Sequence, residues 1–168
     1  VLKSLTGIGG APKGVAVSPD GRLVFVTNEH LFGKVTVIDS ATNMVVSTIA
    51  VGDWPSAVAL TPDGTRAYVT NGGGGTVSVI DTASYAVLGS PIAVGSHPNS
   101  IAITTDGTQA YVGNESGNTV SMIAIASNTV TSTLGGINSP RGVAARPIPS
   151  GILRDFRIGS AVVAGCKA

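Results

Sequence analysis

The chain is built from short segments in which apolar and polar residues alternate, and turn-forming residues separate these segments. Val35, Val37 and Asp39 fall on one predicted face of such a segment. Thr36 and Ile38 fall on the other face. An alternation with a period of two residues places successive side chains on opposite sides of a β-strand. The pattern therefore predicts an all-β fold.

Two landmarks in this pattern recur with a constant step of 43 residues. One is the aspartate of a Pro-Asp-Gly or Thr-Asp-Gly turn, and the other is the asparagine that ends the next strand. They occur at Asp20, Asp63 and Asp106 and at Asn28, Asn71 and Asn114. A third landmark, Val-x-Val-Ile-Asp or a close variant of it, recurs at nearly the same step. Independent landmarks that share one period of this length indicate a repeat protein.

Each repeat divides into four short strands. In the second repeat these are predicted at residues 57–60, 67–70, 77–81 and 86–94. The turn between the first two strands suits a hairpin, because proline fixes φ, aspartate bonds back to the backbone and glycine tolerates a positive φ. Four short antiparallel strands in a repeat of about 40 to 45 residues are typical of a β-propeller blade.

The strand after each turn carries a recognisable motif. Phe25-Val-Thr-Asn28 and Tyr68-Val-Thr-Asn71 follow Pro-Asp-Gly turns and precede Val-x-Val-Ile-Asp. These motifs resemble the YVTN-family β-propeller repeat, from which Tyr111-Val-Gly-Asn114 departs at one residue. The resemblance covers about residues 11–140. It implies a propeller and an extracellular, periplasmic or cell-surface location, but no single activity.

We predict a single propeller domain with about three complete repeats of four-stranded antiparallel blades and a degenerate fourth. The domain covers residues 1–168, and its blades lie at about 11–55, 56–98 and 99–140.

The two ends of the chain match parts of a blade. Residues 1–10 resemble a last strand, and the tail, residues 141–168, begins like a first strand at 142–145. Further strands are predicted at 152–158 and 161–164. Two arrangements stay open. Either the two ends close the ring by strand exchange, or the chain is a partial propeller that associates with a second copy or belongs to a longer protein. We therefore expect a homo-oligomer or a part of a longer chain.

Composition narrows the classes of partner. The net charge is +1 and only 11% of the residues are charged, so the chain lacks the clustered basic stripe of a nucleic-acid-binding protein. No apolar run approaches the roughly 20 residues of a membrane span. Cys166 is the only cysteine, which excludes an intrachain disulfide. The segment that starts at Val1 has the pattern of a strand rather than of a signal peptide.

The candidate site lies in loops. In a propeller, the loops between blades and the loops between the second and third strands of a blade open on the same face. The residue before the proline of each inter-blade loop changes from repeat to repeat, and variable residues on a constant frame suit a recognition surface. These residues are Ala11, Trp54, His97 and Ser139. The candidate binding residues are Trp54, His97, His30, Glu29, Asp53, Asn71 and Glu115.

No residue set in the chain matches a catalytic or metal-binding motif. The histidines and carboxylates of the candidate loops have no spacing that favours a metal site, and we expect neither a metal nor a cofactor. The glycine run 72–75 lacks the Lys-Ser/Thr pair of a phosphate-binding loop. Asn114-Glu-Ser116 fits the N-glycosylation sequon, a match that occurs often by chance.

The leading interpretation is a non-catalytic binding scaffold that recognises protein or glycan through the face with Trp54 and His97. One alternative is a fragment of a propeller enzyme: a lyase, a lactonase or a quinoprotein-type dehydrogenase. Another is an assembly element that forms a ring from two or more chains.

Overall fold

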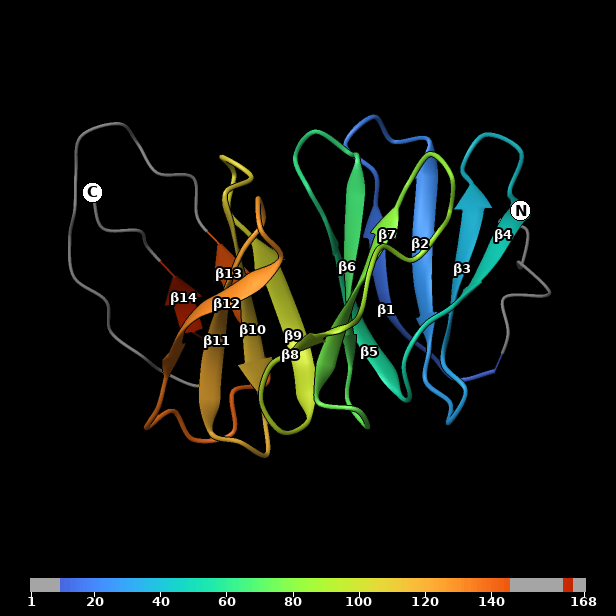
Figure 1. Ribbon diagram of the computed structural model, residues 1–168. Coiled ribbons are helices and arrows are strands. Elements are labelled where there is room, and N and C mark those ends of the chain that lie inside the picture. The colour runs from blue at the N-terminus through green and yellow to red at the C-terminus, as the bar shows by residue number, and fades with distance from the viewer. Residues whose placement is uncertain (1–9, 146–161, 165–168) are drawn as a thin grey trace.

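The computed structural model describes residues 10–145 and 162–164 of the chain. These residues form three four-stranded antiparallel sheets in chain order and a two-stranded sheet (Figure 1). Blade 1 comprises β1 (Pro12–Val17), β2 (Leu23–Asn28), β3 (Lys34–Asp39) and β4 (Met44–Ala50). Blade 2 comprises β5 (Pro55–Leu60), β6 (Arg66–Asn71), β7 (Thr76–Asp81) and β8 (Ile92–Ala93). Blade 3 comprises β9 (Pro98–Ile103), β10 (Gln109–Asn114), β11 (Thr119–Ala124) and β12 (Thr129–Leu134).

Each blade is a meander, in which strands that are neighbours in the sheet are also neighbours in the sequence. The prediction of an all-β chain with four-stranded antiparallel blades is confirmed. In the part of the chain that the structure describes, no helix is long and apolar enough to cross a membrane.

The inner strands begin at the prolines, two residues earlier than the sequence predicts. Pro55 pairs with Asn71, which ends the second strand of the same blade, and Pro98 pairs with Asn114 in the same way. Each inner strand has an irregularity close to its proline. Proline has no N–H to donate, so it is tolerated at the first residue of a strand or at a bulge.

The outer strand of blade 2 is much shorter than the predicted strand 86–94, and this prediction is wrong. Only β8 (Ile92–Ala93) and a single pairing between Val87 and Ile80 are present. Gly89 between them has a positive φ of 62°. Pro91 follows, and it cannot donate a ladder hydrogen bond. These two residues interrupt a strand that the apolar pattern alone makes continuous.

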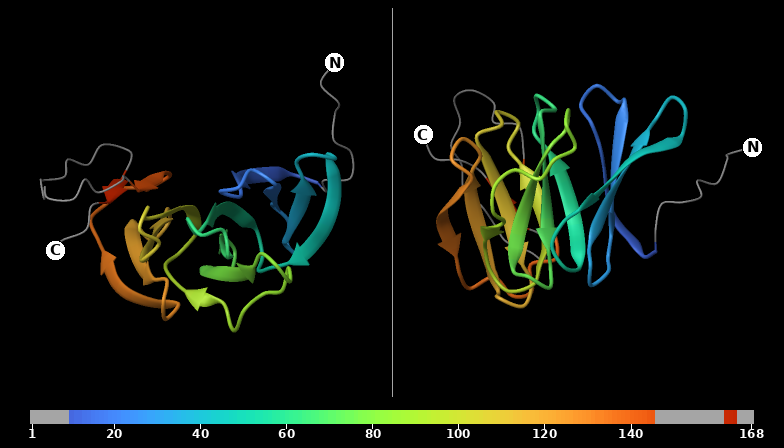
Figure 2. Two further views of the ribbon diagram at one scale, coloured as in Figure 1. Left: turned by 90° about the horizontal axis from the view of Figure 1, so that it is seen from above. Right: turned by 45° about the vertical axis from the view of Figure 1, so that its right-hand side comes forward.

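The three blades follow one another as an open arc (Figure 2). The inner strands β1, β5 and β9 lie next to one another on its concave side, and the fourth strands lie on the outside. Strands β2 and β3, with their counterparts in the other blades, are buried on both faces, so Thr36 and Val37 are equally inaccessible. Alternation in these strands therefore separates the two interfaces of a blade rather than a core face from a solvent face.

The same interface is built twice between successive blades. At the first, Phe25 and Val35 of blade 1 pack against Val69 and Ile80 of blade 2. At the second, the equivalent residues are Tyr68 and Val77 of blade 2 and Val112 and Ile123 of blade 3. Each blade thus presents one face with an aromatic residue to its successor and a different, aliphatic face to its predecessor. The 43-residue period of the sequence is the period of this packing.

The third repeat has Gly113 where the first two repeats have threonine. A second difference, in the neighbouring inner strand, explains this substitution. In blades 1 and 2 the hydroxyls of Thr27 and Thr70 accept hydrogen bonds from the inner-strand N–H groups of Gly14 and Ala57, at 2.7 and 2.9 Å. In blade 3 Gly113 pairs with Ser100 of the inner strand. A Cβ at position 113 would collide with the Ser100 Oγ. The serine therefore fills the space that the threonine fills elsewhere.

The Asp-Gly turns between the first two strands are local structures. The Asp63 carboxylate accepts hydrogen bonds from the Thr61 hydroxyl at 2.5 Å and from the Thr65 N–H at 3.0 Å. Asp20 and Asp106 make the same bonds in their own turns. In all three aspartates the pKa is lowered, and the largest cause is the hydrogen bond from the Ser or Thr hydroxyl two residues earlier.

We expect acid to weaken the fold through these turns. Because the folded-state pKa lies below the unfolded value of about 3.9, the unfolded state binds more protons at acidic pH. The stabilisation is present above about pH 4 and is lost as the pH falls through the folded-state pKa. Urea unfolding at several pH values should show a shallower decline below pH 4 for the triple variant Asp20→Asn, Asp63→Asn, Asp106→Asn than for the wild type. An equal slope for both proteins would contradict this assignment.

The tail departs from the predicted antiparallel fourth blade. Strand β13 (Val143–Ala145) takes the place of a fourth inner strand beside β9, as predicted. Its partner β14 (Val162–Ala164) runs parallel to it. A parallel pair needs a connection of about a dozen residues or more, and the chain between the two strands is long enough for that. The strands predicted at 1–10 and 152–158, and Cys166, lie outside the described residues.

Candidate functional site

The loops between blades and the loops between the second and third strands lie side by side, at the same end of the strands in every blade. Backbone hydrogen bonds join them at the same place in each blade. The Glu29 N–H donates to the Ala11 carbonyl at 2.9 Å, and the Glu115 N–H donates to the His97 carbonyl at 3.0 Å. In blade 2 the corresponding bond leads to the Trp54 carbonyl at 2.9 Å.

We call the variable positions of this end the rim. The rim comprises the residues on either side of each inter-blade proline and the first residue after each second strand. These are Ala11, Lys13 and Glu29 in blade 1, Trp54, Ser56 and Gly72 in blade 2, His97, Asn99 and Glu115 in blade 3, and Ser139 and Arg141 after it.

The residue before each inter-blade proline has the left-handed backbone conformation. The φ values of Ala11, Trp54, His97 and Ser139 are 50°, 54°, 54° and 42°. This conformation is unfavourable for residues with a Cβ, so it persists only where the surrounding structure holds it. The hydrogen bonds between the two sets of loops do so here. Four different side chains are therefore presented from one fixed backbone geometry.

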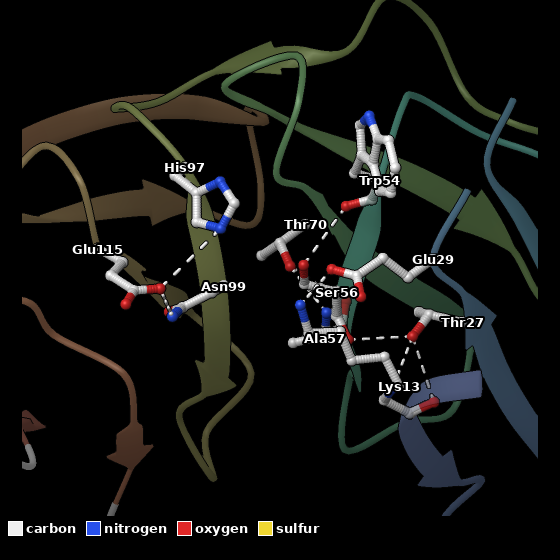
Figure 3. A network of polar contacts seen from close by, with 11 residues as sticks. Lys13, Thr27, Glu29, Trp54, Ser56, Ala57, Thr70, His97, Asn99 and Glu115 are labelled. Atoms are coloured by element: carbon white, nitrogen blue, oxygen red, sulfur yellow. Dashed lines mark hydrogen bonds and ion pairs between the residues drawn. The ribbon is translucent and has the colours of Figure 1, made fainter. Parts of the chain in front are cut away.

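In blade 1 two rim residues, Lys13 and Glu29, form an ion pair (Figure 3). In blade 3 the Glu115 carboxylate has two donors: the Asn99 Nδ2 and the Arg141 Nε, each at 2.7 Å. The His97 Nε2 lies 4.0 Å from the same carboxylate. Glu115 thus lies close to side chains from the inner strand, the inter-blade loop and the segment after blade 3.

In blade 2 the rim has no side-chain pair of this kind, because Gly72 stands where the other blades have glutamate. A Cβ at position 72 would lie 3.2 Å from the Trp54 carbonyl oxygen and only in ordinary contact with the His97 ring, 3.5 Å from its Cε1. A Cβ at position 73 would lie 2.5 Å from the Trp54 Cδ1. Gly73 therefore leaves room for the Trp54 ring. This steric role explains one glycine of a run that has no phosphate-binding pattern.

Apolar side chains add to this end of the molecule. Trp54 is 44% exposed, and the loop between β2 and β3 carries the exposed Leu31 and Phe32, the latter 76% exposed. The Trp54 N–H donates to the His30 carbonyl at 2.9 Å, so this loop and the Trp54 loop are in direct contact. The end with the variable residues is therefore also rich in exposed apolar surface.

Most of the sequence-predicted residues lie in these loops, but they do not form one cluster. His97 and Glu115 approach each other, Glu29 pairs with Lys13, and Asp53 and His30 are exposed. Within residues 10–145 and 162–164, no three histidine, cysteine, aspartate or glutamate side chains are placed to hold a metal ion.

Asn71 lies inside its blade rather than at the surface. Its side chain is fully buried, and its amide donates to the hydroxyls of Thr76 and Ser78 at 3.0 and 2.9 Å. Asn114 is buried in the same way, so the sequon that begins there is inaccessible in the folded chain. These asparagines join the second strand to the third.

Sequence reasoning missed Lys13, Asn99 and Arg141, and it missed the exposed Leu31 and Phe32. The first three follow the inter-blade prolines, where a variable position was visible but had no recognisable chemistry. Leu31 and Phe32 lie in a connection that is one residue longer in blade 1 than in blades 2 and 3. That extra residue is a sequence signal that could have drawn attention to this loop.

The rim, together with the neighbouring loop that carries Phe32, can bind a ligand in three ways. Trp54 and Phe32 offer aromatic surface, and aromatic residues are enriched at binding interfaces. Glu115 offers a carboxylate that hydrogen bonds from Asn99 and Arg141 hold in position. His97, beside a carboxylate, has the chemistry of a general base, although proton transfer would also need a substrate within hydrogen-bond reach.

Comparisons with protein-family models and with solved structures relate the chain to known proteins. The family model described as lactonase, 7-bladed beta-propeller matches residues 6–145. A structure of Kuenenia stuttgartiensis hydrazine synthase matches with 32% identity and a TM-score of 0.73, over 84% of this chain and 40% of that one. A functionally unknown protein from Desulfotomaculum acetoxidans DSM 771 matches with 21% identity and a TM-score of 0.69, over 78% and 44%.

The structure of the RRP9 WD40 repeats matches with only 16% identity but a TM-score of 0.72, over 80% of this chain and 41% of that one, which shows a common fold alone. No match was found among the curated proteins. The chain thus spans less than half the length of the solved structures that it resembles. The family model covers most of the chain, and the chain therefore belongs to the lactonase family of seven-bladed β-propellers.

Proposed function

We propose that this chain is a non-catalytic binding scaffold and that its rim recognises protein or glycan. The observation that carries the proposal is the constant left-handed backbone before each inter-blade proline, which presents Ala11, Trp54, His97 and Ser139 in turn. A backbone held in an unfavourable conformation at several equivalent loops is commonly found where a protein binds a ligand. The exposed Trp54 and Phe32 beside it support recognition rather than packing.

We also propose that the repeats are of the YVTN type and that the protein is extracellular, periplasmic or on the cell surface. The Tyr-Val-Thr-Asn strands that follow Pro-Asp-Gly turns support this assignment. The family found by comparison is broader and specifies neither point. The chain spans less than half the length of its solved relatives. Any function of a longer protein that contains these blades is therefore also a proposal.

The experiment is a glycan array and a pull-down from the source organism's culture, each repeated with matched variants. Trp54→Ala and His97→Ser place residues at the rim that Ala11 and Ser139 already carry with nearly the same φ, so the fold should be kept. We expect each to weaken binding by about tenfold or more, as is common for a central interface residue. Thr105→Ala is the control, because Thr105 lies in a turn at the end of the strands opposite the rim.

Binding that survives both rim variants would overturn the proposal, and so would an equal loss in the Thr105→Ala control. Retained strand content in the circular dichroism spectrum of each variant separates a loss of contact from a loss of fold.

A propeller enzyme fragment is the second candidate, favoured by membership of the lactonase family and by the 4.0 Å separation of the His97 Nε2 and Glu115 Oε2. Its chemistry would be lactone hydrolysis, in which His97 removes a proton from the attacking water and Glu115 orients the imidazole. The same protein preparations can be assayed to decide between the scaffold and the enzyme. Hydrolysis of a sugar lactone that disappears in Glu115→Gln and His97→Ser would favour the enzyme over the scaffold.

A further inference from the structure

The loop between β2 and β3 of blade 1 presents two large apolar side chains to solvent, Leu31 and Phe32, which we call the apolar pair. Phe32 is more exposed than any other large apolar side chain that the structure describes, and Leu31 is 49% exposed. The equivalent loops of blades 2 and 3, residues 72–75 and 115–118, contain only glycine and polar residues. The apolar pair is therefore no part of the repeat and belongs to the one loop that is a residue longer.

The backbone of this loop is held on both sides of the apolar pair. Before the pair, the His30 carbonyl accepts a hydrogen bond from the Trp54 N–H at 2.9 Å. After it, the Gly33 carbonyl accepts from the Val51 N–H at 3.0 Å. A Cβ at position 33 would collide with the Gly52 carbonyl oxygen, so glycine lets this loop lie directly against the inter-blade loop. Binding through the apolar pair therefore requires little ordering of the backbone.

The charged residues around the apolar pair carry no excess of negative charge. Lys34 follows the loop, is exposed and forms no ion pair with a described carboxylate. Glu29, at the start of the loop, is paired with Lys13. The neighbouring inter-blade loop contributes Asp53, which lies on the side of blade 2 against Gly73. The surface next to the apolar pair is therefore compatible with zwitterionic or anionic headgroups.

The side chains exposed here are those that enter a lipid interface. Tryptophan is enriched where headgroups meet acyl chains, and leucine and phenylalanine are the apolar residues of interfacial segments. A lysine beside them can bury its stem while its ammonium group stays among the headgroups. Side chains that protrude from a fixed loop suit a deformable layer, whereas a protein would need a pocket shaped to receive them. These features favour a lipid surface as the partner.

We propose that the apolar pair and Trp54 insert into the interface of a lipid surface, with Lys34 at the level of the headgroups. The inserted surface comes from two loops in direct contact, one of blade 1 and one that leads into blade 2. Large exposed apolar patches on soluble domains mark protein or membrane contacts, and this one commits to lipid. The proposal goes beyond the recognition of protein or glycan at the rim and does not depend on it.

The test uses two kinds of unilamellar vesicle, one of phosphatidylcholine alone and one of phosphatidylcholine and phosphatidylserine in equal amounts. Trp54 is the only tryptophan of the chain, so its fluorescence reports on this surface without a label. We expect its emission to shift to shorter wavelength with both vesicles, and the protein to co-sediment with them. Binding should be about fivefold tighter to the anionic vesicles, the effect of one lysine near the surface.

Phe32→Ser and Leu31→Ser should each weaken vesicle binding by about tenfold, because each removes one inserting side chain. Both residues are exposed, so the fold should persist, and the circular dichroism spectrum checks this. Met44→Ser is the matched control: Met44 is also an exposed apolar residue, but it begins β4 at the end of the strands opposite the rim. Its vesicle binding should equal that of the wild type.

An unchanged Trp54 emission and no co-sedimentation with either vesicle would overturn the proposal. Binding that tolerates Phe32→Ser and Leu31→Ser together would overturn it too, and so would an equal loss in Met44→Ser. If vesicles do not bind but Phe32→Ser abolishes capture of a protein in the pull-down, the apolar pair contacts protein and the lipid proposal is wrong, while the proposed binding function stands.

Discussion

Replacing Tyr68 by alanine is expected to lower the free energy of unfolding by about 3–5 kcal/mol. The ring is fully buried between blades 2 and 3, where it packs with Val77 and Ile123. Its hydroxyl donates to the Asn128 Oδ1 at 2.5 Å, so the side chain also joins β6 to the outer turn of the next blade. The variant therefore loses apolar burial, leaves a cavity and breaks a hydrogen bond between blades.

Tyr68→Phe is the matched control, because Phe25 occupies the equivalent position of blade 1. It keeps the ring and removes only the hydroxyl, so we expect a loss of about 1 kcal/mol. Urea unfolding followed by circular dichroism measures both variants. If alanine and phenylalanine cost the same, the ring would not be the main contact between the blades.

The second large effect is expected at the position where the third repeat departs from its motif. Gly113→Thr should cost about 2 kcal/mol, because the added side chain meets the Ser100 hydroxyl in a packed interior. Ser100→Ala alone should be nearly neutral, because the buried Ser100 Oγ has no hydrogen-bond partner among the residues that the structure describes. The double variant recreates the arrangement of blade 2, where the Thr70 hydroxyl accepts from the Ala57 N–H.

We therefore expect the two substitutions to be coupled by about 1–2 kcal/mol in a double-mutant cycle. Recovery will be incomplete, since a Cβ at position 113 also lies 3.0 Å from the Pro140 carbonyl oxygen. Unfolding free energies of the four proteins give the coupling directly. Additive effects would mean that Ser100 does not occupy the place of the missing threonine.

The strands and turns were predictable because their causes lie within a few residues. The Asp63 carboxylate bonds to Thr61 and Thr65, its close neighbours in the chain, and the turn residues set the backbone angles themselves. The failure at the outer strand of blade 2 was also local in origin, since Gly89 and Pro91 were visible. The prediction gave more weight to the apolar pattern of residues 86–94 than to these two turn-forming residues.

The rim was only partly predictable because its contacts join residues far apart in the chain. Glu115 meets Asn99, 16 positions away, and Arg141, 26 positions away. The variable position of His97 was visible, but its positive φ was not, since a bulky residue before proline has no local preference for that conformation. Asn71 illustrates the reverse case: it ends a strand near the rim, yet it is buried within the blade.

The repeat, the four-strand blade and the positions at which the copies differ can all be read from the sequence. Those features follow from alternation, turn chemistry and a constant period, which are properties of neighbouring residues. The packing of the blades sets which variable side chains meet, why Gly73 is a glycine beside Trp54, and that Val15 is exposed where Val58 is covered. Burial and side-chain contact depend on the blade that packs alongside, and no local pattern in one repeat contains that information.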